Sequence, residues 1–150
     1  MSERHVVFVV FSDAMLLDLS GPMAAFEIAC ETAALDSRPY RLIVASEKGG
    51  LVKTSSGLEI MTRPILELDQ IDTLLVVGGP GVHEAARSAP LVSWLSDCAG
   101  QIRRLCAVCT GAFVLASAGL LRQRRAVTHW GSCNLLRDRY PDTTVLPDAI

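Results

Sequence analysis

The sequence predicts an α/β fold, a three-layer sandwich with a mostly parallel sheet between two layers of helices. Short apolar runs rich in β-branched residues recur along the chain, which is typical of strands buried on both faces. Helical segments alternate with these runs, and this alternation favours parallel strands joined by right-handed crossovers. Several runs end in glycine-rich or polar segments, and ligands of such sheets bind beyond the carboxyl ends of the strands.

The expected elements follow from these patterns in chain order. Strands are predicted over residues 5–11, 40–45, 73–77 and 105–108, with short strands over 126–128 and 143–146 and a hairpin made of 51–54 and 57–61. Proline is favoured in the first turn of a helix, so Pro22 is expected to begin the first one. Helices are predicted over 23–34, 91–102, 113–121 and 132–139.

Length and composition limit the class of protein. The chain has 150 residues, of which 50% are hydrophobic and 20% charged, as expected for one globular domain. The formal net charge of −2 provides no electrostatic footprint for nucleic acid. No apolar run approaches the roughly eighteen residues of a membrane span, and the amino-terminal segment is too short for a signal peptide. We therefore expect a cytoplasmic protein that does not bind membranes.

A cysteine stands where a predicted strand meets a predicted helix. Cys109 follows the strand over 105–108 and precedes Thr110 and Gly111, after which the sequence is helical. A nucleophile at a sharp strand-to-helix turn has the organisation of a nucleophile elbow, where small neighbours accommodate a strained backbone. The positive end of the helix dipole would lower the thiol pKa from about 8.5 to about 7. The alternative is that Cys109 is one more small buried residue.

The remaining cysteines indicate neither a disulfide framework nor a metal site. Five cysteines at irregular spacing argue against disulfides. Cys106 and Cys109 have the spacing of a redox pair, but Cys106 lies inside the predicted strand and is expected to face the core. No second closely spaced pair would complete a zinc site. We therefore expect no metal and no cofactor.

Two other predicted strands are followed by residues that would meet Cys109 at the same edge of the sheet. An ionised Asp18 would raise the thiol pKa, whereas a protonated carboxyl would donate a hydrogen bond to the thiolate, so the pair is expected to share a proton. Gly78 and Gly79 would let their N–H groups approach a bound anion closely. The plainer alternatives are a solvated loop aspartate or helix cap for Asp18, and a tight turn for the two glycines.

Three further side chains are candidates for this site. Thr110 offers a hydroxyl and an N–H at the start of a helix, although it would serve equally as an N-terminal cap. His129 would act as a base or an orienting group if it lay within reach of Cys109. The alternative is a core histidine bonded to a carbonyl. His83 is a further candidate in the loop after the glycines.

Five motifs occur in an order that resembles a known family. Together they resemble the ThiJ/PfpI superfamily, which has the class I glutamine amidotransferase-like fold. More narrowly, they resemble the amino-terminal domain of AraC/XylS-type transcriptional regulators of the GlxA/FtrA sort. The resemblance covers almost the whole chain and implies a flavodoxin-like sandwich that is usually a homodimer, with a nucleophile elbow. The motifs occupy residues 17–22, 76–81, 108–113, 118–121 and 128–130.

The resemblance implies an effector-sensing domain that binds a small metabolite at Cys109 and Asp18. Gly79 and Thr110 would supply N–H groups to the pocket, and DNA would be bound only by a carboxyl-terminal helix-turn-helix domain beyond residue 150. The alternative is an enzyme similar to isocyanide hydratases, with Cys109 as nucleophile and Asp18 as acid and base. A third interpretation is a redox sensor that forms a sulfenic acid at Cys109.

The sequence departs from the family pattern in two places. Protease and glyoxalase-like members carry a histidine directly after the nucleophile, where this chain has Thr110, which argues against a Cys-His dyad and against peptidase activity. The family continues with further elements beyond residues 147–150. We therefore expect residues 1–150 to form an incomplete domain with part of its core uncovered.

Overall fold

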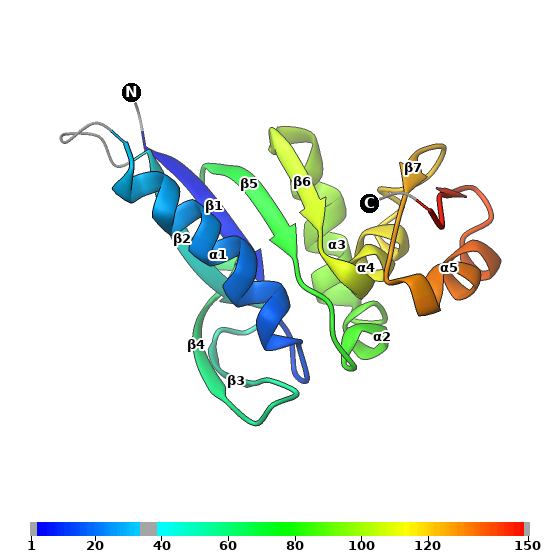
Figure 1. Ribbon diagram of the computed structural model, residues 1–150, viewed down its shortest axis with the longest axis horizontal. Helices are drawn as coiled ribbons and strands as arrows, with labels where there is room; N and C mark the ends of the chain where they lie inside the picture. The colour runs from blue at the N-terminus through cyan, green and yellow to red at the C-terminus, as the bar shows by residue number, and fades with distance from the viewer. Residues whose placement is uncertain (1–2, 34–38, 149–150) are drawn as a thin grey trace.

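Six strands form one sheet in the order β3-β4-β2-β1-β5-β6, with helices on both faces (Figure 1). The computed structural model describes residues 3–33 and 39–148. Parallel pairing joins β1 to β2 and β5, β2 to β4, and β5 to β6. The predicted mostly parallel α/β fold is therefore confirmed. The strands are β1 (Arg4–Val9), β2 (Tyr40–Ser46), β3 (Gly50–Lys53), β4 (Glu59–Pro64), β5 (Ile71–Val76) and β6 (Arg104–Ala107).

The antiparallel exception in this sheet is the predicted hairpin. β3 pairs with β4 in antiparallel register, with Leu51 opposite Met61 and Val52 opposite Ile60. A second, two-stranded sheet pairs β7 (Arg125–Ala126) with β8 (Thr144–Val145) in parallel. Both short strands fall within, or within one residue of, the ranges that the sequence predicts.

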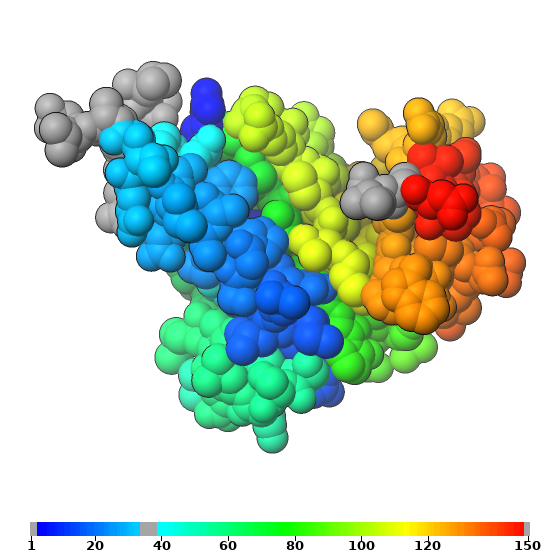
Figure 2. Space-filling model, viewed as in Figure 1, coloured from blue at the N-terminus to red at the C-terminus, as the bar shows by residue number. Residues whose placement is uncertain are grey.

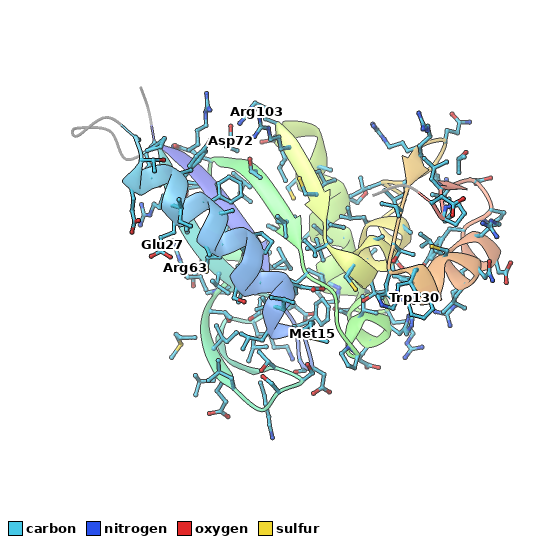
Figure 3. All side chains as sticks on the ribbon, in the orientation of Figure 1. Met15, Glu27, Arg63, Asp72, Arg103 and Trp130 are labelled. Carbon is cyan, nitrogen blue, oxygen red and sulfur yellow. The ribbon has the colours of Figure 1, made fainter. Side chains whose placement is uncertain are left out.

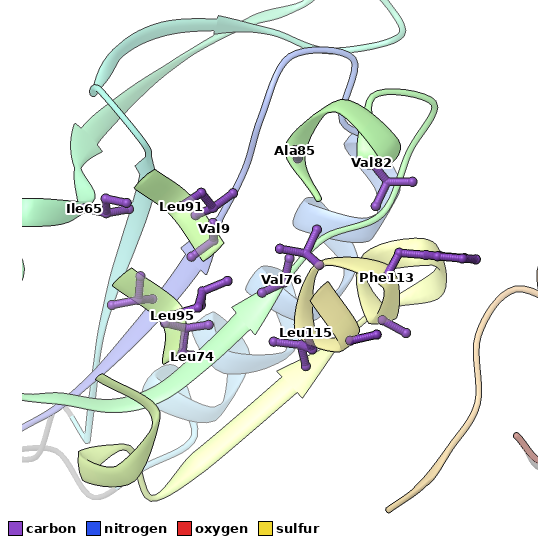
Figure 4. Close-up of a cluster of buried hydrophobic side chains, with 14 of the residues drawn as sticks. Val9, Ile65, Leu74, Val76, Val82, Ala85, Leu91, Leu95, Phe113 and Leu115 are labelled. Carbon is purple, nitrogen blue, oxygen red and sulfur yellow. The ribbon is translucent and has the colours of Figure 1, made fainter. Parts of the chain in front are cut away.

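Alternate residues of β1 bury opposite faces of the sheet. Successive side chains of a strand point to opposite sides, so a central strand needs apolar residues throughout. Val7 and Val9 belong to the cluster under the helices of one face, part of which is drawn in Figure 4. Val6 and Phe8 belong to the other cluster, against the first helix. All four side chains are fully buried.

The helices divide between these two faces. α1 covers one face, and α3 and α4 cover the other (Figure 1). Leu95 of α3 and Phe113 of α4 are fully buried against the second face. None of the helices in residues 3–33 and 39–148 combines the length and apolar character needed to cross a membrane. The helices are α1 (Leu16–Glu31), α2 (Val82–Ala85), α3 (Ala89–Cys98), α4 (Ala112–Ser117) and α5 (Cys133–Arg139).

The first helix begins seven residues earlier than the sequence predicts. Pro22 was expected to start the helix at residue 23, but it lies inside α1, which starts at Leu16. A proline in a helix interior removes one hydrogen bond and its ring crowds the carbonyl four residues earlier, yet α1 tolerates Pro22, and the buried Leu19 packs the preceding turn on the sheet. Asp18 is therefore in the first turn of α1 and not in a loop. The predicted end of this helix at Ala34 lies outside the described residues.

The helix after Cys109 is shorter than predicted. Its predicted range of 113–121 is replaced by a 3-10 turn over Cys109–Gly111 followed by α4, which ends at Ser117. Gly119 adopts a positive φ of 74°. A glycine in this left-handed conformation is the usual termination of an α-helix. The remaining residues to 121 therefore form turns.

Candidate functional site

The predicted strand-to-helix turn at Cys109 is present and its backbone is strained. Cys109 has a φ of 53°, in the left-handed region that side chains other than glycine rarely adopt. The next turn passes close to β5, because a Cβ on Gly111 would lie 2.4 Å from the Val76 carbonyl oxygen. Glycine is therefore required at 111 for the chain to turn here. The sulfur-bearing residue is half-buried at the carboxyl ends of β5 and β6.

The first turn of α1 brings Asp18 to the loop that follows β5. The Gly78 N–H donates to Asp18 Oδ2 at 3.0 Å, across 60 positions of sequence. A Cβ on Gly78 would lie 2.7 Å from Asp18 Oδ2 and 2.8 Å from the Thr110 nitrogen. The absence of a side chain at 78 thus permits α1 and the elbow to approach each other.

The second glycine of this loop is bonded to the elbow. The Gly79 N–H donates to Thr110 Oγ1 at 3.0 Å. Gly79 has a φ of 134°, and a Cβ there would lie 2.4 Å from the Met15 nitrogen. Both glycine N–H groups that the sequence predicts to face a bound anion therefore donate to side chains of the protein itself in this structure.

The environment of Cys109 disfavours ionisation of the sulfur. Burial raises the pKa of the Cys109 thiol above its ordinary value. The Thr110 backbone N–H and hydroxyl lower this pKa, whereas the Asp18 carboxylate raises it through its charge and a hydrogen bond. The Thr110 N–H at the start of the helix lowers the thiol pKa, in the direction the sequence predicts, but desolvation and the neighbouring negative charge outweigh it, so the net shift is upward.

The segment after β7 contacts the elbow through Thr128 and not through His129. The Thr128 hydroxyl donates to the Cys109 carbonyl oxygen at 2.9 Å. His129 is exposed, its Nδ1 accepts from the Gly131 N–H at 3.3 Å, and its ring lies 5.2 Å from that of Trp130. Within the described residues no hydrogen bond joins His129 to Cys109. The alternative of a core histidine is also wrong, because the side chain is in solvent.

Thr128 was missed as a separate candidate. The only signal in the sequence was its place in the motif over residues 128–130. A threonine near a short strand usually needs no functional explanation, and only the folded chain brings it to the elbow.

The other candidates lie apart from this arrangement. His83 packs its ring 5.0 Å from Phe113, and Arg139 lies 3.2 Å from its Nδ1. Burial and the charges of Arg139 and Arg87 lower the His83 pKa. Cys106 packs against the cluster that contains β1 side chains, as predicted. Burial raises the pKa of the Cys106 thiol, as it does that of Cys109.

The elbow reaches the molecular surface between two exposed apolar side chains. Met15, at the start of α1, is 42% exposed and Trp130 is 82% exposed. Both lie at the end of the molecule where β5 and β6 finish (Figure 3). In the space-filling view the yellow elbow segment is visible between the blue start of α1 and the orange segment of Trp130 (Figure 2).

Two hollows of the surface lie elsewhere. One of about 540 Å³ is lined by residues of α4, α5 and the turns after them, among them Arg122 and Arg139. Another of about 590 Å³ lies at the ends of β1 and β2 beside α2, with Glu47 and Arg87 in its lining. Neither lining includes Cys109. In the part of the chain that the structure describes, no three side chains are grouped to hold a metal ion.

The family of this chain follows from comparison with known proteins. The DJ-1/PfpI family matches residues 4–147. The chain belongs to the DJ-1/PfpI family. The family resemblance seen in the sequence is therefore confirmed, and it extends over almost all of the strands and helices described above.

Relatives of this DJ-1/PfpI domain include both an enzyme and regulators. It is 39% identical over 139 residues to an "uncharacterized protein in cpoL 5′ region" of Streptomyces lividans, covering 92% of this chain and 96% of that one. The chain is 30% identical over 135 residues to isonitrile hydratase of Pseudomonas putida, a match that covers 88% of this chain and 55% of the hydratase. The chain is 38% identical over 107 residues to the HTH-type transcriptional regulator CdhR of Pseudomonas aeruginosa, a match that covers 71% of this chain and 32% of the regulator. The chain thus spans about half of the hydratase and a third of the regulator.

Solved structures with the same fold include a regulator as well. A ThiJ/PfpI family protein from Pseudomonas syringae superimposes with a TM-score of 0.82 at 22% identity, over 96% of this chain and 57% of that one. An AraC family transcriptional regulator from Pseudomonas putida superimposes with a TM-score of 0.77 at 24% identity, over 96% of this chain and 76% of that one. These similarities establish the flavodoxin-like α/β fold. The catalytic and ligand-binding roles of Asp18, Gly78, Gly79, Thr110, Cys109 and His129 stay predictions.

Proposed function

We propose that this DJ-1/PfpI domain senses a small metabolite for an AraC-type transcriptional regulator, with the ligand bound at Cys109 and Asp18. The observation that carries the proposal is that Asp18 and the Gly78–Gly79 loop meet at the half-buried Cys109 elbow, through the Gly78–Asp18 and Gly79–Thr110 hydrogen bonds. Burial also raises the pKa of the Cys109 thiol, which disfavours the thiolate. The thiol is suited to contact a bound molecule and poorly suited to attack one.

The groups around the sulfur favour a small polar ligand with hydrogen-bond donors, such as an amide. Asp18 uses Oδ2 for the Gly78 N–H, and its Oδ1 can accept from a ligand N–H. The Thr110 hydroxyl accepts from the Gly79 N–H and faces the Cys109 sulfur as a donor. Displacement of either glycine bond by a ligand would free a backbone N–H for a carbonyl oxygen.

The remaining parts of the proposal concern the whole protein. Related regulators are HTH-type, and this chain corresponds to 32% of CdhR and 37% of GbdR of Pseudomonas aeruginosa. We therefore propose that DNA is bound by a separate helix-turn-helix domain beyond residue 150. We further propose that the protein is a cytoplasmic homodimer. The net charge of −2 is consistent with a domain that does not itself bind DNA.

Thermal unfolding in the presence of small amides tests the proposed site. A ligand at a hundred times its Kd stabilises the folded state by about 2.7 kcal/mol, a rise in melting temperature of about 5–10 °C. We expect at least one member of a panel of formamide, acetamide and larger primary amides to raise the melting temperature of the wild type and not of Cys109→Ala. Cys106→Ala, at a half-buried cysteine in β6, the strand that precedes Cys109, is the control. An equal rise in Cys109→Ala would place the ligand elsewhere.

The second candidate function is hydration of an isonitrile. It is favoured by the 30% identity to isonitrile hydratase over 88% of this chain and by the proximity of Asp18 to Cys109. The Cys109 thiolate would add to the terminal carbon, the nitrogen and carbon would be protonated, and water would displace the sulfur to leave an N-substituted formamide. Wild-type protein that forms no formamide from an alkyl isonitrile, at any pH where it is folded, would exclude this candidate.

A further inference from the structure

A buried threonine holds the peptide group on which the environment of the sulfur depends. Thr128 is 8% exposed and its hydroxyl donates to the Cys109 carbonyl oxygen at 2.9 Å, across 19 positions of sequence. The same segment is held from its other side, because the Cys133 thiol contacts the Thr128 carbonyl oxygen at 3.9 Å. Thr128 is therefore fixed in place and does not act as a mobile surface hydroxyl.

The carbonyl that Thr128 binds and the N–H that faces the sulfur belong to one rigid unit. The Cys109 C=O and the Thr110 N–H are the two ends of a single peptide group, which is planar and trans, so they point in opposite directions. A hydrogen bond that fixes the direction of the carbonyl therefore fixes the direction of the N–H. Of the groups that lower the Cys109 pKa, the Thr110 N–H contributes most.

The elbow needs such a restraint. Cys109 has a φ of 53°, a conformation that residues with a side chain rarely adopt and that persists only where its surroundings hold it. Before the turn, the Val108 N–H is bonded to the Val76 carbonyl at 2.9 Å. After the turn, Gly111 is packed on β5. Thr128 acts between these two points, on the peptide that follows the sulfur-bearing residue.

We propose that Thr128 is a positioning residue for Cys109, whose hydrogen bond orients the 109–110 peptide so that the Thr110 N–H points at the sulfur. The proposal concerns the geometry of the sulfur and goes beyond the proposed function. It applies whether the site binds a ligand or performs chemistry.

The other groups that face the sulfur are accounted for. Asp18, from α1, is the charged group that contributes to the Cys109 pKa, and the Thr110 hydroxyl is the second donor. His129, beside Thr128, is exposed, and its Nδ1 accepts from the Gly131 N–H. Substitution of Thr128 therefore removes no charge from the site, and its effect on the sulfur passes through the peptide.

The pH profile of Cys109 alkylation by iodoacetamide tests the proposal, with peptide mapping to separate Cys109 from the other cysteines. Without the Thr128 bond, the Thr110 N–H should turn away from the Cys109 thiolate. The loss of a hydrogen bond to a charged group is worth about one pKa unit, so the alkylation midpoint of Thr128→Val should rise by about one pH unit. Thiolate at pH 7 then falls about tenfold. The rate falls only about threefold, because a more basic thiolate is more nucleophilic.

Two variants serve as controls. Thr128→Ser keeps the hydroxyl and should restore the wild-type midpoint. Thr143→Val removes a comparable bond, from a buried threonine 5% exposed to the Leu121 carbonyl at 3.1 Å, and should leave the Cys109 profile unchanged.

The outcomes separate positioning from general stability. A raised midpoint in Thr128→Val alone supports the proposal. A midpoint equal to that of the wild type, or equal shifts in Thr128→Val and Thr143→Val, overturns it. If Thr128→Val does not fold, Thr128→Ala is measured against Thr128→Ser by the same criterion. The readout uses no effector, so failure of the proposed metabolite binding leaves this test intact.

Discussion

Replacing Asp18 by asparagine isolates the electrostatic contribution of the carboxylate to the candidate site. The Asp18 carboxylate accepts the Gly78 N–H at 3.0 Å, and an amide oxygen can accept the same bond, so the backbone should stay in place. The substitution removes the negative charge and hydrogen-bonding carboxylate that raise the pKa of Cys109. We therefore expect the Cys109 pKa to fall and the thiolate population at neutral pH to rise.

The expected magnitude follows from the exposure of the two groups. Two unit charges 4 Å apart interact by about 1 kcal/mol in water and about 4 kcal/mol at an effective dielectric constant of about 20. Both Asp18 and Cys109 are partly exposed, so solvent screening selects the lower part of this range. One pKa unit corresponds to about 1.4 kcal/mol. The pKa of Cys109 should therefore fall by about one unit, with about tenfold more thiolate at pH 7.

The assay is the pH dependence of Cys109 carboxamidomethylation, followed by peptide mass spectrometry. Glu27→Gln removes a carboxylate from the exposed side of the same helix, away from the site, and is the matched control (Figure 3). Its profile should overlay that of the wild type. An unchanged or higher midpoint in Asp18→Asn would refute the assignment of Asp18 as the carboxylate that opposes ionisation of the sulfur.

Three further predictions concern stability. Asp72 has its pKa lowered to about 2 by the Arg103 guanidinium, which donates to it at 2.7 and 2.6 Å. This pair should stabilise the folded state at neutral pH, and the contribution should disappear from about pH 4 to 2, so that urea midpoints of wild type and Asp72→Asn converge in acid. Gly78→Ala should lose about 1–3 kcal/mol in urea unfolding, whereas Gly100→Ala, with nothing within 4 Å of its Cβ, should not; equal midpoints would contradict the tight approach at 78. Leu95→Ala, which empties a fully buried position, should lose about 2–5 kcal/mol, and a loss under 1 kcal/mol would contradict the packing of α3 on the sheet.

The sequence was most informative where the structure depends on local pattern. The β-branched run of β1 indicated burial on both faces because successive side chains of a strand alternate. The cysteine followed by small residues indicated a sharp turn because few other residue types fit a strained backbone. Both features are properties of neighbouring residues and can be read without knowing what packs against them.

Pattern failed where distant contacts outweigh local preference. Proline normally begins a helix, yet Pro22 lies inside α1 because Leu19 packs the preceding turn against the sheet. An interior proline costs about 3 kcal/mol, and burial of the apolar side of α1 on the sheet offsets that cost. The spacing of apolar residues around Pro22 does not predict that this turn packs on the sheet.

By itself the sequence determined the parallel α/β architecture, the position of the elbow and the family to which the chain belongs. Only the tertiary structure decided that the Gly78 and Gly79 N–H groups are bonded to Asp18 and Thr110, and that Thr128 binds the Cys109 carbonyl. It also decided the direction of the Cys109 pKa shift. The reason is physical: strand and turn preferences act between neighbours, whereas desolvation and hydrogen bonds between distant segments exist only after those segments have packed together.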